Sequence, residues 1–161
     1  MQDSVLEDNP NFLLFFVSIF FAFCFSIIPL TGMAASLRPE MICLVMFYWT
    51  LKHPQQYGVI LSWIVGLCWD VLMGTTLGVH GLALALQAYL ILTMIQRLQM
   101  YPVLQQSFVV FFITGIVLML YRWIDGFLAQ PARDLVYLLG AFSSAVCWPF
   151  LVTLLRRFDH A

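Results

Sequence analysis

The residue types that most often carry chemistry are few in this chain and lie far apart. It holds no Cys-x-x-Cys pair and no two histidines four residues apart, so the ligand spacing of a zinc, iron–sulfur or haem site is missing. Gly-x-Ser-x-Gly, Walker and dinucleotide-binding motifs are missing too. We interpret the cysteines as small apolar side chains of helix interiors. The four cysteines are Cys24, Cys43, Cys68 and Cys147, and the three histidines are His53, His80 and His160.

Two carboxylates leave one catalytic alternative open. Asp70 and Asp125 both lie near the ends of apolar segments, where a pair that shares one proton would suit an intramembrane aspartic peptidase. However, Arg122 precedes Asp125 by three residues, which is the spacing of an ordinary helical ion pair. We therefore favour a protein that is not an enzyme and that needs no cofactor.

The most distinctive stretch of the sequence contains Gly66, Asp70, Gly74 and Gly78, one every four residues. On a continuous helix they would share one face, where small residues let a second helix approach closely in lipid. An aspartate is costly at the bilayer centre. If the helix ends near residue 73, Asp70 lies near the membrane surface, where it packs helices, caps a nearby loop or forms an ion pair. A direct ligand or ion site is the alternative.

A second constellation is Arg38-Pro39-Glu40, which precedes another apolar segment. Pro39 suits the first turn of a helix that follows it. With six spans, Arg38 lies on the same side of the membrane as the glycines at 74 and 78. Arg38 and Asp70 would then meet, each lowering the other's desolvation cost. Exchanging the two charges should in that case restore more function than either single change.

The composition shows which elements must position these residues. Of 161 residues, 63% are hydrophobic and 9% are charged, and mean hydropathy is +0.95. A water-soluble globule of this size has too little interior to bury so much apolar surface. The net charge of −1 offers no basic surface for nucleic acid. Composition therefore excludes a soluble enzyme, a nucleic-acid binder and a disordered chain, and predicts an all-α polytopic membrane protein.

Spanning helices need ~20 residues each, so this length holds about six. We expect them at residues 11–30, 41–51, 57–73, 78–95, 104–124 and 135–155, although the short second and third segments leave a re-entrant element open. The first ten residues carry three acids and no base, unlike a signal peptide. We expect one integral membrane domain over 1–161, with short tails at 1–10 and 156–161. With six spans, Lys52, Arg97, Arg156 and Arg157 lie on the same side of the membrane as the two tails, and Arg38 and Arg133 lie on the other side. Because basic residues are more frequent on the cytoplasmic side, this distribution favours both tails in the cytoplasm.

These features also carry a family resemblance. Arg38-Pro39-Glu40 and the apolar run to Phe47-Tyr48-Trp49 are followed by Gly66-x-x-x-Asp70-x-x-x-Gly74-x-x-Leu77-Gly78. Trp148-Pro149 lies late in the last segment and Arg156-Arg157 follows it. From about residue 37 to 157 the chain resembles the rod shape-determining protein MreD family. It departs from the usual pattern at Glu40, where a neutral polar residue is more frequent, and at Ser62, where a further glycine is common.

The resemblance implies a non-enzymatic scaffold of the bacterial cell-elongation machinery, located in the inner membrane and supporting lateral peptidoglycan synthesis and cell shape. Its implied partners are the bitopic protein MreC, the actin-like MreB filament, the glycosyltransferase RodA and its penicillin-binding transpeptidase. Arg38, Pro39, Gly66, Asp70, Gly74 and Gly78 are the structural and partner-contact residues we expect, with partner transmembrane helices docked in lateral grooves.

The same resemblance implies a fold like that of the substrate-binding subunits of energy-coupling-factor transporters. A small-ligand-binding subunit is therefore the rival function, because fold alone does not decide function. Such a subunit needs a polar pocket between helices, open to the outer face. The residues available for it are Gln87, Tyr89, Tyr121, Arg122 and Asp125.

Overall fold

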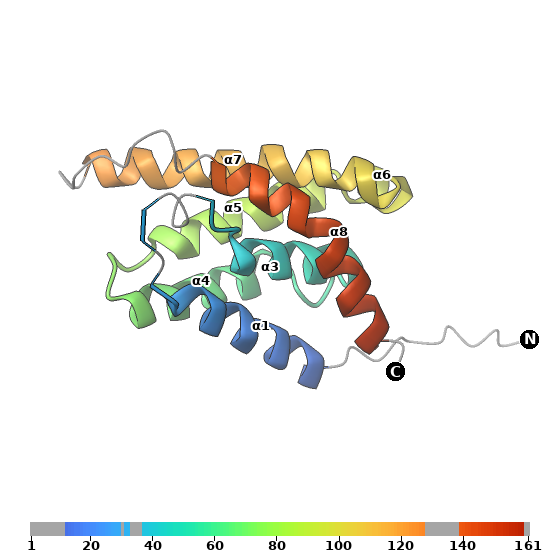
Figure 1. Cartoon of the computed structure of the whole chain (residues 1–161), viewed down its shortest axis with the longest axis horizontal. Coiled ribbons are helices and arrows are strands. Elements are labelled where there is room, and N and C mark those ends of the chain that lie inside the picture. Colours follow the sequence, from blue (N-terminus) through green and yellow to red (C-terminus); the bar gives the residue numbers. More distant parts are fainter. Residues whose placement is uncertain (1–11, 30, 33–36, 128–138, 160–161) are drawn as a thin grey trace, which may run out of the picture.

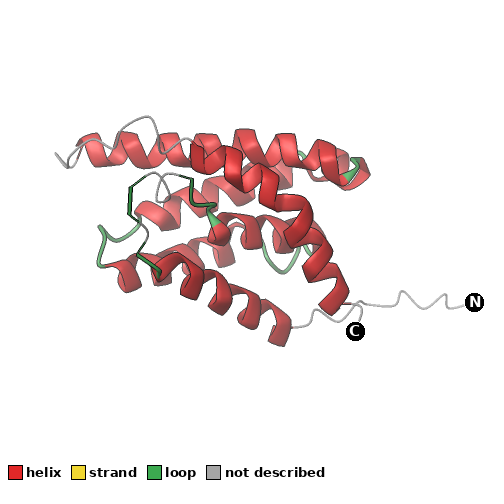
Figure 2. Cartoon of the chain, in the orientation of Figure 1, coloured by secondary structure: helices red, strands yellow, loops and turns green. Residues whose placement is uncertain are grey.

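The computed structural model describes residues 12–29, 31–32, 37–127 and 139–159, and this part of the chain is all helical (Figures 1 and 2). It forms seven helices and no strand, which confirms the all-α prediction. The helices are α1 (Phe12–Ile27), α3 (Met41–Lys52), α4 (Val59–Met73), α5 (Val79–Thr93), α6 (Ile95–Met100), α7 (Val103–Phe127) and α8 (Leu139–Asp159).

Each of the six expected segments overlaps one of these helices; α3, α7 and α8 extend beyond the expected ends, and α6 is an addition that the sequence did not predict. Two helices are long and apolar enough to cross a membrane, Val103–Ile124 within α7 and Leu139–Phe158 within α8. Four others are apolar but shorter, with 12 to 16 residues each. At 1.5 Å per residue, α3 is only ~18 Å long against a hydrocarbon core of ~30 Å. Six complete spans therefore stay a prediction.

Helix α3 lies at the centre of the molecule, with α1, α5 and α8 packed around it (Figure 1). Every residue from Ile42 to Leu51 is buried, on all sides of the helix. Phe47 and Trp49 on α3 are 1% and 0% exposed. A helix that is apolar all round can thus be buried in protein rather than in lipid, and its short length is tolerated because the other helices shield its ends.

The outer helices bury one face and expose an apolar one. On α1 the buried residues are Phe15, Ser18, Ile19 and Ala22, spaced as one face of a helix. The opposite face carries Phe20, whose side chain is 65% exposed. On α7, Phe108 and Phe112 are similarly exposed. So much exposed aromatic surface suits a lipid environment and not water.

Polar side chains tie these helices together inside the core. The indole Nε1 of Trp49 on α3 donates to the Ser18 hydroxyl on α1 at 3.0 Å. The backbone N–H of Glu40, at the start of α3, donates to the Ser144 hydroxyl on α8 at 2.9 Å. Because each bond satisfies groups that lipid and a dry core cannot hydrate, it fixes the position of one helix against another.

Replacing the buried Leu44 of α3 should destabilise the whole bundle. Leu44 is 0% exposed, so Leu44→Ala leaves a cavity and should lower the free energy of unfolding by about 2–5 kcal/mol. Leu13→Ala, at a side chain that is 80% exposed on α1, is the matched control and should change it little. Thermal unfolding of the full chain in detergent measures both. Equal losses in the two variants would contradict a central α3.

Candidate functional site

The distinctive stretch of the sequence forms the turn between α4 and α5, and its first half closes α4. Gly74 follows α4 in the left-handed conformation, with φ of +64°. Its N–H donates to the carbonyl of Val71 at 3.4 Å, and the N–H of Thr75 donates to the carbonyl of Asp70 at 3.1 Å. This pair of bonds is a Schellman motif, which satisfies the last carbonyls of a helix and favours glycine at the left-handed position.

The side chain of Asp70 satisfies the start of the next helix. Its carboxylate is fully buried and accepts hydrogen bonds from the N–H groups at the first turn of α5, which have no partner within their own helix. These are the backbone N–H groups of Gly78 at 2.8 Å, His80 at 3.2 Å and Gly81 at 3.4 Å. Asp70 therefore caps α5 from α4, and its negative charge lies where the helix dipole favours an anion.

Two side chains complete the shell around this carboxylate. The Thr75 hydroxyl donates to Oδ1 at 3.0 Å, and Nδ1 of His80 lies 2.6 Å from the same oxygen. The His80 ring packs against Tyr121 of α7, with ring centroids 4.6 Å apart. Because both carboxylate oxygens already accept backbone N–H groups, Asp70 and His80 hold a turn together. Of the roles that the sequence left open for Asp70, this arrangement corresponds to a cap for a nearby loop.

Gly66 provides the close helix approach that the sequence predicts, but it does so within this chain. A Cβ at Gly66 would lie 2.5 Å from the Cα of Gly81 on α5, so α4 and α5 cross in backbone contact there. Gly74 and Gly78 lie beyond the end of α4 and share no helix face with Gly66. Gly78, with φ of +99°, is needed for its backbone conformation.

The predicted ion pair between Arg38 and Asp70 is wrong. The Arg38 guanidinium donates to the carbonyl of Ile28 at 3.1 Å and to the carbonyl of Phe25, and it lies over the Phe25 ring. It therefore satisfies the last carbonyls of α1, which have no helical partners. Asp70 is paired with His80 instead. The charge exchange proposed from the sequence thus has no basis in this geometry.

Pro39 also differs from its predicted position. The first helical residue of α3 is Met41 and its N-cap is Glu40, so Pro39 precedes the helix instead of occupying its first turn. Its carbonyl accepts a hydrogen bond from the N–H of Met41 at 2.9 Å. The chain thereby turns into α3 at Pro39.

The residues considered for a ligand pocket differ in their surroundings, and none of them lines the lateral groove described below. Gln87 is 1% exposed and donates to the carbonyl of Cys43 at 2.6 Å, and Tyr121 hydrogen-bonds the Cys43 side chain, so both belong to the packed interior. Tyr89 is 59% exposed on α5. The side chain of Asp125 lies outside the described residues, so its distance from Asp70 stays untested.

Sequence reasoning missed His80 and Gly81 as partners of the distinctive stretch. The residue pattern assigns no role to His80 and does not single out Gly81. A usable signal existed, because Gly78-x-x-Gly81 follows Asp70 within one turn segment, and a buried carboxylate needs donors nearby. Periodicity alone does not reveal this, since the donors are mostly backbone N–H groups.

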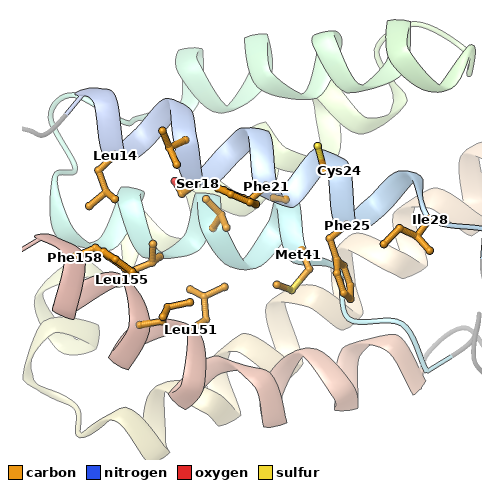
Figure 3. A pocket seen from close by; sticks show the side chains of 14 residues that line it. Leu14, Ser18, Phe21, Cys24, Phe25, Ile28, Met41, Leu151, Leu155 and Phe158 are labelled. Carbon is orange, nitrogen blue, oxygen red and sulfur yellow. The ribbon is translucent and has the colours of Figure 1, made fainter.

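A hollow of about 680 Å³ lies between α1 and α8, with α3 behind it, and we call it the lateral groove (Figure 3). Side chains of α1 and α8 face each other across it. Phe25 and Ile28, whose carbonyls accept hydrogen bonds from Arg38, both line this groove, so Arg38 lies near the C-terminal end of its α1 wall. The lining is almost wholly apolar and includes Val17, Phe21, Phe25, Val45, Leu151, Leu154 and Phe158.

Comparison with known proteins identifies the family. The model of the family described as rod shape-determining protein MreD matches residues 8–158. The chain belongs to the MreD family. It is 32% identical over 121 residues to the rod shape-determining protein MreD of Haemophilus influenzae, and the match covers 75% of each chain. The resemblance found in the sequence is thereby confirmed.

Membership of the MreD family supports a role in the rod-shape-determining complex, and neither the transporter nor the peptidase alternative gains support from these relatives. The apolar helices of this MreD-family chain agree with a membrane protein. No solved structure matches it, so the expected likeness to substrate-binding subunits of energy-coupling-factor transporters stays a prediction.

Adding one methyl group at Gly66 should disrupt the α4–α5 crossing. Gly66→Ala places a Cβ against the Gly81 backbone, which has no flexible end to move aside, so the helices must separate and the melting temperature should fall. Gly115→Ala is the matched control, because that α7 glycine has nothing within 4 Å and alanine favours a helix. Thermal unfolding in detergent compares them, and an unchanged Gly66→Ala protein would refute the crossing.

Replacing the Asp70 carboxylate by an amide should weaken the cap of α5. The hydrogen-bond partners of the Asp70 carboxylate are N–H and O–H donors and the His80 ring. In Asp70→Asn, the new NH₂ group faces donors, so the hydrogen bonds to one of the two carboxylate oxygens are lost. We expect the free energy of unfolding to fall by about 1.5–3 kcal/mol. Thr75→Val, which removes a single hydroxyl from the same shell, should cost less. Equal stability of Asp70→Asn and the wild type in denaturant titrations would argue against the cap.

Proposed function

We propose that this chain is a non-enzymatic membrane scaffold of the cell-elongation complex and that it holds one partner transmembrane helix in the lateral groove. The occupant we propose is the spanning helix of a bitopic partner, which for this family is MreC. MreB, RodA and its penicillin-binding transpeptidase would then join the same assembly through further contacts. This proposal extends the family's role in rod-shape determination to a defined surface of the molecule.

The groove's chemistry is the observation that carries the proposal. Small-ligand sites combine apolar walls with a few converging polar groups that fix the ligand's orientation. Ser18 is the hydroxyl-bearing residue in the lining, and its Oγ donates to the carbonyl of Phe15 and accepts from Trp49. The groove therefore presents an apolar surface whose hydroxyl group already has hydrogen-bond partners. Such a surface suits the apolar side chains of a transmembrane helix better than a polar small ligand.

The groove's length fits the same occupant. Its α1 wall runs over the twelve residues from Leu14 to Phe25, which is ~16 Å or three helical turns at 1.5 Å per residue. Three turns present the repeated apolar contacts by which helices recognise each other in a membrane. The groove opens sideways between α1 and α8, whose outer residues Phe20 and Phe150 are exposed, so a helix can enter from the lipid.

We further propose a single multi-pass domain of the inner membrane with both termini in the cytoplasm. The first residues of α1 and the last residues of α8 lie at the same end of the molecule (Figure 1). Arg156 and Arg157 occupy the last turn of α8, and Lys52 occupies the last turn of α3. Basic residues at helix ends favour the cytoplasmic side. Reporter fusions at each terminus would test this orientation.

Filling the lateral groove should abolish function while the fold is kept. In a rod-shaped cell depleted of its own protein, wild-type chain should restore rod shape and Val17→Trp should leave the cells round, because the indole occupies the partner's space. Phe20→Trp is the matched control: it adds an indole to the outer face of the same helix and should restore rods. Cell shape is imaged over a few generations, with membrane levels of each variant measured by immunoblot.

A photo-crosslinking residue in the groove separates this function from its rival. Placed at Leu154, it should capture the bitopic partner in wild-type membranes, and Val17→Trp should remove that product. Rod-shaped growth with the Val17→Trp variant, or depleted cells that keep their shape but require an added nutrient, would overturn the scaffold.

A further inference from the structure

Helix α8 changes direction part-way along its length (Figure 1), and Pro149 lies inside it. We assign the bend to this proline, which divides the helix into two parts with different attachments. Proline has no N–H, so the carbonyl of Ala145 loses its helical partner and the helix can change direction there. The hydroxyl of Thr153, beyond the bend, donates to the carbonyl of Pro149 at 2.7 Å, within the same helix. The direction of the second part is therefore not dictated by a continuous helical ladder.

The part of α8 before the bend is held firmly to two other helices. Ser144 accepts the N–H of Glu40 at the start of α3. Trp148, the residue just before the proline, is 0% exposed and its Nε1 donates to Oε1 of Gln106 on α7 at 3.3 Å. The Trp148 ring also lies edge-on to Phe47 of α3, with centroids 4.9 Å apart.

Gln106 is itself fixed in one orientation. Its side chain is buried, and its Nε2 donates to the carbonyls of Leu98 and Tyr101, at 3.0 and 3.2 Å, at the end of α6. With the amide nitrogen engaged by two acceptors, the amide oxygen must face a donor, and Trp148 supplies the N–H. The α6–α7 turn, α7 and α8 are thus joined at one amide group.

The part of α8 beyond the bend forms one wall of the lateral groove. Leu151, Leu154, Leu155 and Phe158 all line it. Within the described chain, no side-chain hydrogen bond joins residues 150–158 to another helix. Val152 and Leu155 attach this part by apolar packing alone, so Trp148 is the last hydrogen-bonded anchor that sets the direction of the wall.

We infer that Gln106 is a positioning residue for partner docking: by holding the Trp148 indole directly before the Pro149 bend, it sets the direction of the α8 wall and hence the width of the lateral groove. This inference rests on the proposed function. Phe158 lies nine residues beyond the bend, ~13 Å away, so a change of roughly 10° would move it about 2 Å. Gaps of 0.5–1 Å already forfeit a sizeable part of the dispersion attraction, so such a shift matters for docking.

The width of the groove can be measured without any partner. In the full chain with its four native cysteines replaced, spin labels at Val17→Cys and Phe158→Cys report the distance between the α1 and α8 walls in lipid nanodiscs. We expect one narrow distribution for this parent protein. Gln106→Leu and Trp148→Phe should each broaden it or shift it by about 2 Å, as the lever arm above indicates.

A double-variant cycle distinguishes the hydrogen bond from general loss of packing. If the bond is responsible, Gln106→Leu combined with Trp148→Phe should disturb the distance no more than either single change. Ser143→Ala is the matched control, since that α8 hydroxyl bonds only to Gly140 of its own helix and its removal should leave the distribution unchanged. If Gln106→Leu does not fold, Trp148→Phe with its control carries the test.

Partner capture then shows whether the wall's position matters. In membranes, capture by the photo-crosslinking residue at Leu154 should fall several-fold in both variants. An unchanged distance distribution in Gln106→Leu and Trp148→Phe overturns the inference, and so does a changed distribution with undiminished capture. The proposed function still stands in either case if Val17→Trp removes the crosslinked product and rod shape. Absence of partner capture by the wild-type chain itself would instead overturn the proposed function.

Discussion

One buried carboxylate organises the half of the molecule formed by α4 and α5. Asp70 accepts three backbone N–H groups and two side chains at once, so it ends one helix and begins the next. Water cannot replace these bonds in a dry interior, and each donor left alone would carry the full cost of desolvation. Because Gly66 then brings α4 onto Gly81, the two helices form one hairpin that holds α5 against α3.

The short helix α3 is the second constraint, because it is shorter than the hydrocarbon core and is buried on all sides by the helices around it. Its polar ties run to three of them: Trp49 to α1, the N–H of Glu40 to α8, and the Cys43 carbonyl to Gln87 of α5. Helices α1 and α8 both contact α3, and residues of all three helices line the hollow between α1 and α8. The lateral groove is the space between them, so it follows from how a short central helix is enclosed.

The proposed scaffold role rests on the chemistry of this groove. Its walls are apolar, and its hydroxyl lies in a bond between α1 and α3. The polar groups with the most distinctive chemistry, Asp70 and His80, are engaged with each other at the α4–α5 turn. In the part of the chain that the structure describes, these polar groups therefore fix helix ends and helix contacts.

The sequence by itself determined the class, the positions of the six main helices and the family, because hydropathy, helix-ending residues and motif spacing are local properties. It also included a loop cap among several possible roles of Asp70, and it indicated that Gly66 permits close packing. Only the tertiary structure decided that Gly66 meets Gly81, that Asp70 pairs with His80 and not with Arg38, and that Gln106 reaches Trp148. In a chain apolar on all faces, periodicity does not reveal which side of a helix turns inward. These contacts depend on helix rotation and tilt, which packing across the whole bundle sets.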